Sequence, residues 1–284
     1  MTRGTFAEPS RVDMANDVGR YEAWRDSAVD AAAVAAGYIA ESARLRHEIV
    51  WEEKSATDFV SSVDVGAEER IRSVLAERIP GIRFVGEELG ADGAVDDGLV
   101  AIVDPLDGTT NFLHGFPAYC VSIAIALDGV PVAACVHDVA RGGVYHASKD
   151  GGAMRDGEPI RVSKIDRPAR ALIGTGIPFK DTTDADIYLA QMRAFMPLVS
   201  GMRRAGSAAL DLVDVSCGRF DAFWELMLNP WDYAAGLLLI QEAGGRATDL
   251  EGRALTLHAG PVAASNALLH DWFLETLSNA SRGR

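Results

Sequence analysis

The sequence has few cysteines and no long apolar run. Its three cysteines, Cys120, Cys135 and Cys217, are an odd number at wide spacing, which fits neither a disulfide framework nor a zinc site, so we expect reduced core residues. No apolar run approaches the roughly 20 residues that a membrane helix needs, and residues 1–12 lack the apolar segment of a signal peptide. We therefore expect a cytoplasmic protein that does not contact membranes.

Positive charge is also scarce. The chain has 27 Lys and Arg residues against 41 Asp and Glu residues, which gives a net charge of −14. Such a field repels the phosphates that supply most of the affinity for nucleic acids, so we expect no direct nucleic-acid partner. With 284 residues, of which 48% are hydrophobic and 24% charged, the composition is that of an ordinary globular protein and excludes disorder.

No repeat or linker divides the chain, but its pattern changes near residue 150. The first half predicts two helices followed by closely spaced strands, with Asp128-Gly129 as a hairpin turn. The predicted helices cover residues 17–45 and 65–78, and the strands cover residues 83–85, 99–103, 119–127, 131–137 and 144–146. This order indicates a largely antiparallel sheet flanked by the two helices.

The second half alternates between strands and helices. Strands are predicted over residues 172–174 and 220–224, and helices over residues 184–197, 206–217, 231–243 and 266–279. Such alternation indicates a sheet that is covered on both faces. We therefore predict a layered α/β (α+β) protein in two closely packed halves, residues 1–155 and 156–284.

Acidic residues stand at two predicted strand ends and at one helix start. Glu87-Glu88 follows the first strand, Asp104-Pro105-Leu106-Asp107 follows the second, and Asp232 opens an apolar helix. Separately, each has an ordinary structural explanation as a solvated turn, a turn dipeptide or a helix cap. Together, they indicate a site for a hard cation such as Mg²⁺, which prefers oxygen ligands. Most of the metal ligands then lie in the first half, and Asp232 lies in the second.

The segment that follows Asp107 favours a phosphate ligand. Gly108, Thr109 and Thr110 resemble the first turn of a helix, whose free N–H groups bind anions. Carboxylates that hold metal beside amides that hold phosphate are typical of metal-assisted phosphoryl transfer. Because the sequence lacks the glycine-rich Lys-Ser/Thr loop of nucleoside triphosphatases, hydrolysis of a phosphate monoester fits better.

These segments resemble the signatures of the inositol monophosphatase family, which belongs to the lithium-sensitive, magnesium-dependent sugar phosphatases. The matching residues are Gly-Glu-Glu at 86–88, Asp-Pro-Leu-Asp-Gly-Thr-Thr-Asn-Phe at 104–112 and Trp-Asp-Tyr-Ala-Ala-Gly at 231–236. The resemblance runs from about Ala23 to the last predicted helix. It implies an inositol monophosphatase/fructose-bisphosphatase-like α-β-α-β-α sandwich, a homodimer, and hydrolysis of myo-inositol monophosphate to inositol and phosphate without a covalent intermediate.

The resemblance also implies two to three Mg²⁺ ions in each site. Glu87, Asp104 and the Leu106 carbonyl would bind the first ion. Asp104 would bridge to a second ion, which Asp107 and Asp232 would also hold. A third, weaker ion would lie near Glu87.

The same resemblance implies that Thr109 acts on the attacking water. Thr109, hydrogen-bonded to Asp64, would orient this water and, together with Glu87, help to deprotonate it. Asp64 matches because residues 54–64 are similar to the family's Lys-Ser-x-x-Asp-x-Val-Thr-x-x-Asp stretch. Capping of the following helix is the alternative role for Asp64. The amides of Gly108 and Thr109 would take the phosphate.

The alcohol part of the substrate should lie in the second half, near Asp232. In the family, the positions that match Asp107, Ala208, Glu225 and Asp232 contact inositol hydroxyls. Ser207 precedes an apolar helix, and its neighbouring amides could face a ligand, although a plain strand-to-helix turn explains it equally well.

Two features leave the substrate open. Asn229 replaces a histidine that is found near the site in animal members of the family, and Glu225, at the end of a predicted strand, could instead hold the fold or pair with an arginine such as Arg204. The alternative substrates are histidinol phosphate and adenosine 3′,5′-bisphosphate. A different class of function is also open, because a bacterial member of the family is implicated as a protein partner of the transcription and RNA-maturation machinery.

Overall fold

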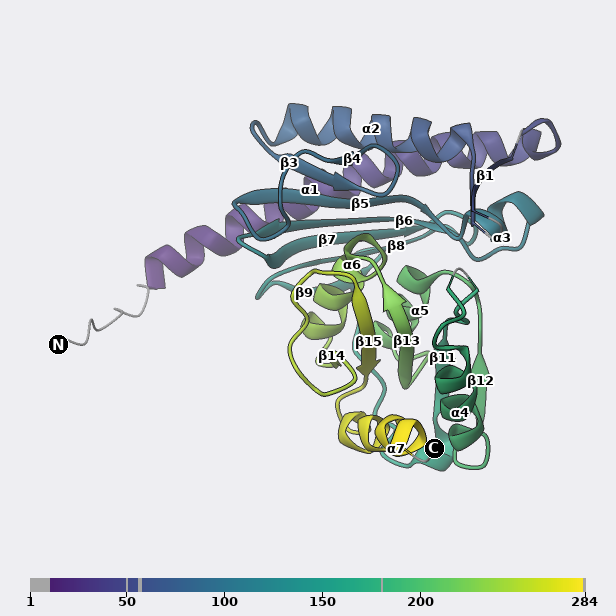
Figure 1. Ribbon diagram of the computed structural model, residues 1–284. Helices are drawn as coiled ribbons and strands as arrows, with labels where there is room; N and C mark the ends of the chain where they lie inside the picture. The colour runs from purple at the N-terminus through teal and green to yellow at the C-terminus, as the bar shows by residue number, and fades with distance from the viewer. Residues whose placement is uncertain (1–10, 50, 56–57, 180, 283–284) are drawn as a thin grey trace, which may run out of the picture.

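The computed structural model describes residues 11–49, 51–55, 58–179 and 181–282. Its elements form five layers in the order helices, sheet, helices, sheet, helices (Figure 1), so the predicted α-β-α-β-α sandwich is confirmed. The six layer-forming helices in the described residues are α1 (Arg11–Ser42), α2 (Ser62–Arg78), α4 (Ala185–Phe195), α5 (Ala208–Ser216), α6 (Pro230–Glu242) and α7 (His270–Arg282). The shorter ones are η1 (Ala43–Glu48), α3 (Thr109–His114) and η2 (Pro168–Arg170).

The larger sheet has eight strands in the order β10-β9-β8-β7-β6-β5-β3-β4, and only the β3–β5 pair is parallel. The predicted antiparallel meander is therefore confirmed. At the predicted hairpin, Asp128 and Gly129 both have positive φ angles, of 48° and 76°. The strands are β3 (Arg83–Gly86), β4 (Gly90–Ala91), β5 (Leu99–Asp107), β6 (Cys120–Leu127), β7 (Val130–Asp138), β8 (Gly143–Ser148), β9 (Gly152–Arg155) and β10 (Glu158–Pro159).

The smaller sheet has five strands in the order β12-β11-β13-β15-β14. β11 is parallel to β12 and β13, whereas β15 runs antiparallel to both of its neighbours. A separate two-stranded ribbon, β1 with β2, precedes α2. The strands are β1 (Glu52–Ser55), β2 (Asp58–Val60), β11 (Leu172–Thr175), β12 (Gly201–Arg203), β13 (Ala222–Leu228), β14 (Arg246–Thr248) and β15 (Gly260–Ser265).

Alternation along the central strands explains why both faces of the large sheet are buried. On β6, Val121, Ile123 and Ile125 pack with α1 and α2, whereas Cys120 and Ala124 point to the opposite side, where α5 and α6 lie. The core around α5 and α6 includes residues of both sheets. The two halves therefore share one apolar layer, and the division at residues 155 and 156 stays a prediction.

Several predicted boundaries were wrong. The strand predicted over residues 99–103 is β5, which continues to Asp107, so Asp104 lies within the strand and does not follow it. The predicted strand 220–224 is β13, which continues to Leu228, so Glu225 lies within the strand and not at its end. The predicted helix 266–279 is α7, which begins only at His270, because Ala267 has a positive φ of 65° and so breaks the helical path.

His270, at the start of α7, is fully buried between β14 and β15. Its Nε2 lies 3.0 Å from Thr248 Oγ1, and its Nδ1 lies 2.8 Å from Ser265 Oγ. Burial lowers the pKa of His270 from 6.5 to about 4. The neutral imidazole is therefore part of the core between the small sheet and α7.

The cysteines are free, as expected: Cys120 and Cys135 are buried, and Cys217 is half-buried. Among the described residues, no helix has the length and apolar character that crossing a membrane requires.

Candidate active site

Asp104 lies on β5 where the register between β5 and β6 shifts. Its side chain is 2% exposed, and its Oδ1 accepts the N–H of Leu106 at 3.0 Å. Burial raises the pKa of Asp104 well above its usual value, and the negative charges of Glu87, Asp107 and Asp232 raise it further. The structure thus brings together the four carboxylates that the sequence predicted as metal ligands.

Glu87 lies in the turn between β3 and β4, and the turn is held by Glu68 of α2. The N–H of Glu87 donates to the Val103 carbonyl at 3.1 Å. The Glu68 side chain is fully buried, and its Oε2 accepts the N–H groups of Glu88 and Leu89 at 2.9 and 3.2 Å. Glu68 therefore fixes the backbone on the side of Glu87 that follows in the chain.

Two further contacts place the Glu68 carboxylate. Arg72 Nε donates to Glu68 Oε1 at 2.9 Å, and Arg72 Nη2 forms an ion pair with the same oxygen at 2.9 Å while it donates to the Gly90 carbonyl at 2.6 Å. A Cβ atom at Gly86 would collide with the Glu68 carboxylate, so this position requires glycine. The sequence analysis missed Glu68, although its position four residues after Asp64 and three before Ile71 places it on the buried face of α2.

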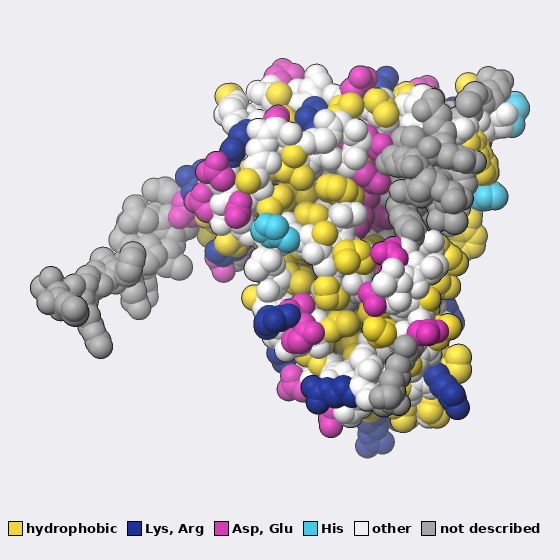
Figure 2. Space-filling view, viewed as in Figure 1, with side chains coloured by type: hydrophobic (Ala, Val, Ile, Leu, Met, Phe, Trp, Pro, Cys, Tyr) yellow, Lys and Arg dark blue, Asp and Glu magenta, His cyan; other side chains and the backbone are white. Residues whose placement is uncertain are grey.

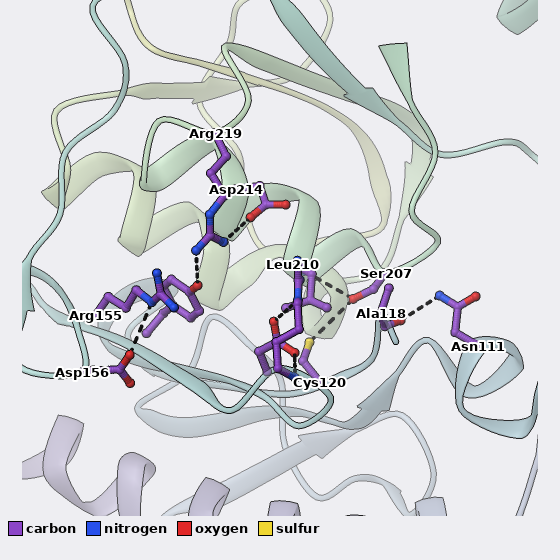
Figure 3. Close-up of polar contacts among 12 residues, drawn as sticks. Asn111, Ala118, Cys120, Arg155, Asp156, Ser207, Leu210, Asp214 and Arg219 are labelled. Carbon is purple, nitrogen blue, oxygen red and sulfur yellow. Dashed lines mark hydrogen bonds and ion pairs between the residues drawn. The ribbon is translucent and has the colours of Figure 1, made fainter. Parts of the chain in front are cut away.

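Asp107 joins the two halves of the molecule. Its Oδ2 accepts the Ser207 hydroxyl at 2.6 Å and the Ala209 N–H at 2.8 Å, both at the start of α5. The Cys120 thiol lies 3.9 Å from the same oxygen and 3.7 Å from Ser207 Oγ. Figure 3 shows Ser207 beside Cys120 and Leu210, whose N–H donates to the Ser207 hydroxyl at 3.3 Å. Ser207 is thus the predicted cap of α5 and also a partner of Asp107.

Asp232 is the third residue of α6. Its Oδ2 accepts the Asn229 N–H at 2.6 Å, which confirms that it caps the helix. Burial raises the pKa of Asp232 well above its usual value, and Asp107 and Glu87 raise it further. The capping role and a place among the site carboxylates therefore coexist.

Thr109 donates its hydroxyl to Asp64 Oδ1 at 2.8 Å, as the resemblance implied, with the Leu106 carbonyl as a second acceptor at 3.1 Å. Asp64 is 1% exposed, and its Oδ2 accepts both the N–H and the hydroxyl of Ser61 at 2.9 and 2.7 Å. Ser61 is the N-cap of α2, and Asp64 completes the capping box. Of the matching stretch 54–64, residues 56 and 57 lie outside the described residues.

Gly108 makes the turn from β5 into α3 possible. Its φ is +95°, and a Cβ atom there would lie 2.7 Å from the Ala118 carbonyl oxygen. The predicted helix start after Asp107 is confirmed, because α3 begins at Thr109. Asn111 of α3 donates to the Ala118 carbonyl at 2.7 Å (Figure 3) and to the Ala205 carbonyl at 3.0 Å, which ties the loop to the second half. Binding of phosphate by the Gly108 and Thr109 amides stays a prediction.

A cavity of about 690 Å³ lies between the two halves. Acidic side chains gather on this side of the molecule between the levels of the two sheets (Figure 2). The structure brings to this cavity every predicted site residue except Asp64, which lies behind Thr109. These lining residues are Glu87, Asp104, Leu106, Asp107, Gly108, Thr109, Ser207, Ala208, Glu225 and Asp232.

The far part of the cavity wall contains residues that the sequence analysis did not select. Asp211 of α5 and Phe179 line it, and the Arg204 guanidinium lies 5.0 Å from the centre of the Phe179 ring. A Cβ atom at Gly176 would collide with the Glu225 carboxylate, which therefore packs directly on the backbone of Gly176.

The carboxylates fit a hard divalent cation. Asp104 and Asp232 are held in a buried, negatively charged environment, which a bound cation would neutralise. In the described part of the chain, no three His, Cys, Asp or Glu side chains are already arranged as a complete metal site. The Leu106 carbonyl, water and phosphate oxygens would complete the shell, as is usual for Mg²⁺.

Comparison with known proteins identifies the family. The family model described as "Inositol monophosphatase family" matches residues 20–282. The chain belongs to this family. Its members are phosphatases that depend on metal ions, typically Mg²⁺.

Several relatives are similar over most of their length. The inositol-1-monophosphatase of Rhizobium meliloti is 45% identical over 213 residues, which cover 75% of this chain and 80% of the relative. The Nus factor SuhB of Pseudomonas aeruginosa is 42% identical over 229 residues, which cover 79% of this chain and 84% of the relative. The crystal structure of the extragenic suppressor protein suhB from Bartonella henselae superimposes with a TM-score of 0.85 at 36% identity, over 89% of this chain and 97% of that one.

Proposed function

We propose that this phosphatase hydrolyses small phosphate monoesters and that its preferred substrate is myo-inositol monophosphate, which it cleaves to inositol and phosphate. One observation carries the proposal. Glu87, Asp104, Asp107 and Asp232 line a single cavity, and Thr109, hydrogen-bonded to Asp64, lies in its wall. The same space therefore contains oxygen ligands for a hard cation and a base for water.

Two to three Mg²⁺ ions would be held by Glu87, Asp104, the Leu106 carbonyl, Asp107 and Asp232. Bound Mg²⁺ lowers the pKa of water and neutralises charge on phosphoryl oxygens. The amides of Gly108 and Thr109, at the start of α3, would hold the phosphate.

Thr109 would hold and deprotonate the attacking water. Because its hydroxyl donates to Asp64 at 2.8 Å, a lone pair of Thr109 Oγ1 remains to accept a proton from water. Burial raises the pKa of Asp64, which favours transfer of a proton from Thr109 to Asp64. Glu87, which lines the same cavity, would help to deprotonate this water. No covalent intermediate is required, because the water held by Thr109 would attack the phosphorus directly.

The alcohol of the substrate would lie against Ser207, Ala208 and Glu225. These residues line the same cavity as the carboxylates but come from the second half of the chain. A volume of about 690 Å³ is in the range of small-molecule sites and accommodates a six-membered ring beside the phosphate. Glu225 supplies an acceptor for ring hydroxyls.

A panel of phosphate monoesters tests this function. Phosphate release by the purified chain with Mg²⁺ would be measured for inositol 1-phosphate, histidinol phosphate, adenosine 3′,5′-bisphosphate and glycerol 2-phosphate. We expect the highest kcat/KM for inositol 1-phosphate. A higher kcat/KM for histidinol phosphate or the bisphosphate would make that ester the preferred substrate. If no ester released phosphate in the presence of Mg²⁺, the proposed phosphatase activity would be refuted.

A second candidate function follows from the relative that is named a Nus factor. In this second function, the chain would bind a protein of the transcription or RNA-maturation machinery. The chain would also form a homodimer. Complementation of a deletion strain with Asp104→Asn separates the two functions. If the inactive variant fails to restore the wild-type phenotype, the phosphatase activity is the required function. If the variant complements the deletion fully, the binding role is the required function.

A further inference from the structure

Asp211, on the first turns of α5, is a buried acid that the proposed mechanism does not use. Its side chain is 2% exposed, and its Oδ1 has no hydrogen-bond partner among the described residues. Buried polar groups without partners are rare in folded proteins because each one costs free energy. An apolar residue of the same size would stabilise this position better, so the structure of the free protein does not explain the carboxyl group.

Among the described residues, the charged groups near Asp211 do not supply a hydrogen-bond partner for its Oδ1. The nearby Asp214 is bound to Arg219 at 2.6 Å, as Figure 3 also shows. The positive charge of Arg204 lowers the pKa of Asp211, but its effect is weaker than those of the nearby acids. The negative charges of Asp214 and Glu225 raise this pKa. Burial first, and these acids second, raise the pKa of Asp211 well above its usual value.

The position of Asp211 in the fold indicates what its partner is. Asp211 lines the same cavity as Ala208 and Glu225, and it follows Ala208 by less than one turn of α5. A hydroxyl group can donate to a carboxylate and accept from a carboxylic acid, so it satisfies Asp211 in either protonation state. The cavity thus presents two acids, Asp211 and Glu225, to the alcohol part of a bound ester.

We propose that Asp211 is a further specificity-determining residue, which forms a hydrogen bond with a hydroxyl of the substrate's alcohol and so favours ring polyol phosphates over small alcohol phosphates. This inference rests on the proposed function for its substrate class. It differs from the roles assigned to Glu225 and Ala208, because the buried Oδ1 of Asp211, which has no partner among the described residues, would gain one when the alcohol binds.

The test compares Asp211→Leu and Asp211→Asn with Asp214→Asn, a control on the same helix whose carboxylate pairs with Arg219. The ratio of kcat/KM for inositol 1-phosphate to that for glycerol 2-phosphate would be measured for each protein. We expect this ratio to fall about tenfold or more in Asp211→Leu, by about threefold or more in Asp211→Asn, and to stay unchanged in Asp214→Asn.

The Tm in EDTA distinguishes a binding role of Asp211 from a structural role, because only a structural role predicts a lower Tm for Asp211→Leu. Removal of an unpartnered buried carboxyl should keep or raise the Tm of Asp211→Leu, whereas loss of the ion pair should lower the Tm of Asp214→Asn. Saturating myo-inositol should raise the Tm of the wild type by more than that of Asp211→Leu, and this comparison cancels the general effect of a polyol on stability.

The outcomes separate this inference from the proposed function. An unchanged substrate ratio in both Asp211 variants, or a lower Tm with an equal loss for both substrates, would overturn the role of Asp211. If the wild type hydrolyses neither ester, the proposed function fails, and the difference in the inositol-induced Tm shift alone decides whether Asp211 binds a polyol.

Discussion

Replacing Glu68 by alanine should weaken metal binding, although Glu68 is not itself one of the proposed metal ligands. Glu68 is fully buried, and its Oε2 accepts the N–H groups of Glu88 and Leu89, which directly follow Glu87. In Glu68→Ala, both N–H groups lose a charged acceptor, and the turn that places Glu87 keeps the contact between Arg72 of α2 and the Gly90 carbonyl but loses its contacts with Glu68. We expect a loss of stability together with a weaker response to Mg²⁺.

The magnitude follows from the contacts. Hydrogen bonds to a charged group contribute roughly 1.5–3 kcal/mol each. Leu89 is 43% exposed, so its released N–H can regain water, and the Arg72 guanidinium keeps its hydrogen bond to the Gly90 carbonyl at 2.6 Å. We therefore expect a loss of about 2–4 kcal/mol in the free energy of unfolding, which is less than the roughly 3–6 kcal/mol that two such hydrogen bonds would contribute in full.

The assay has two parts. Urea unfolding in EDTA would measure stability, and phosphate release over a range of Mg²⁺ concentrations would measure the metal requirement. Residues that orient metal ligands typically change affinity by about 10–100-fold, so the Mg²⁺ concentration for half-maximal activity should rise at least about tenfold, with activity partly restored by excess Mg²⁺. Glu69→Ala, an exposed neighbour on α2, is the matched control.

Two results would refute this reasoning. Stability within about 0.5 kcal/mol of the wild type would show that the Glu68 contacts do not support the turn. A clear loss of stability with an unchanged Mg²⁺ requirement would show that Glu68 supports the fold but does not position Glu87.

Three further predictions concern the water, the substrate and the small sheet. Thr109→Ala should lower kcat by about two or more orders of magnitude with little change in KM, and Asp64→Asn should resemble it; turnover near that of the wild type would exclude Thr109 as the base. Glu225→Gln should reduce kcat/KM for inositol 1-phosphate more than for glycerol 2-phosphate, and an equal decline for both, with a lower Tm, would make Glu225 structural. Because the pKa of His270 is lowered to about 4, its neutral form stabilises the fold fully above pH 6.5, and this contribution, at most about 3 kcal/mol, is lost as the pH falls from 6.5 to 4. Urea midpoints of His270→Asn should then depend less on pH over this range than those of the wild type, and equal slopes would contradict the assignment.

The catalytic segments could be predicted because their chemistry is local in the sequence. Asp104, Asp107 and Thr109 lie within six residues, directly after an apolar strand, and their spacing alone indicates carboxylates beside a helix start. The convergence of Asp232 and Glu225 on the same cavity depends on the packing of two sheets; the pattern of acidic residues indicated it for Asp232, and the family resemblance indicated it for Glu225. The structure supports that convergence.

The buried acids could not be predicted from local pattern. Glu68 and Asp211 look like ordinary helical acids in the sequence, because burial of a carboxylate depends on a partner or a cavity that distant segments form. The start of α7 was placed too early for a similar reason. Ala267 adopts a positive φ that alanine rarely takes, while the N–H of Asn266 donates to the Asp221 carbonyl at 3.0 Å in a distant loop.

Strand β15 was missed because its residues carry weak signals. Residues 260–265 of β15 are mostly small, and the strand forms because it pairs with β13 on one side and β14 on the other. The same pairing with β13 carries that strand past Trp224 to Leu228, which moves Glu225 into the strand. Tertiary pairing therefore decided these boundaries.

Phosphate release from inositol 1-phosphate by the wild type and Asp104→Asn tests the central claim most directly. Asparagine at this position keeps the acceptor for the Leu106 N–H and removes a buried charge that three acids oppose. We expect release by the wild type that EDTA abolishes, no measurable release by the variant at any Mg²⁺ concentration, and a Tm of the variant in EDTA at or above that of the wild type. Release that EDTA does not affect, or a folded Asp104→Asn protein that still hydrolyses the ester, would contradict the claim that these carboxylates form the catalytic metal site.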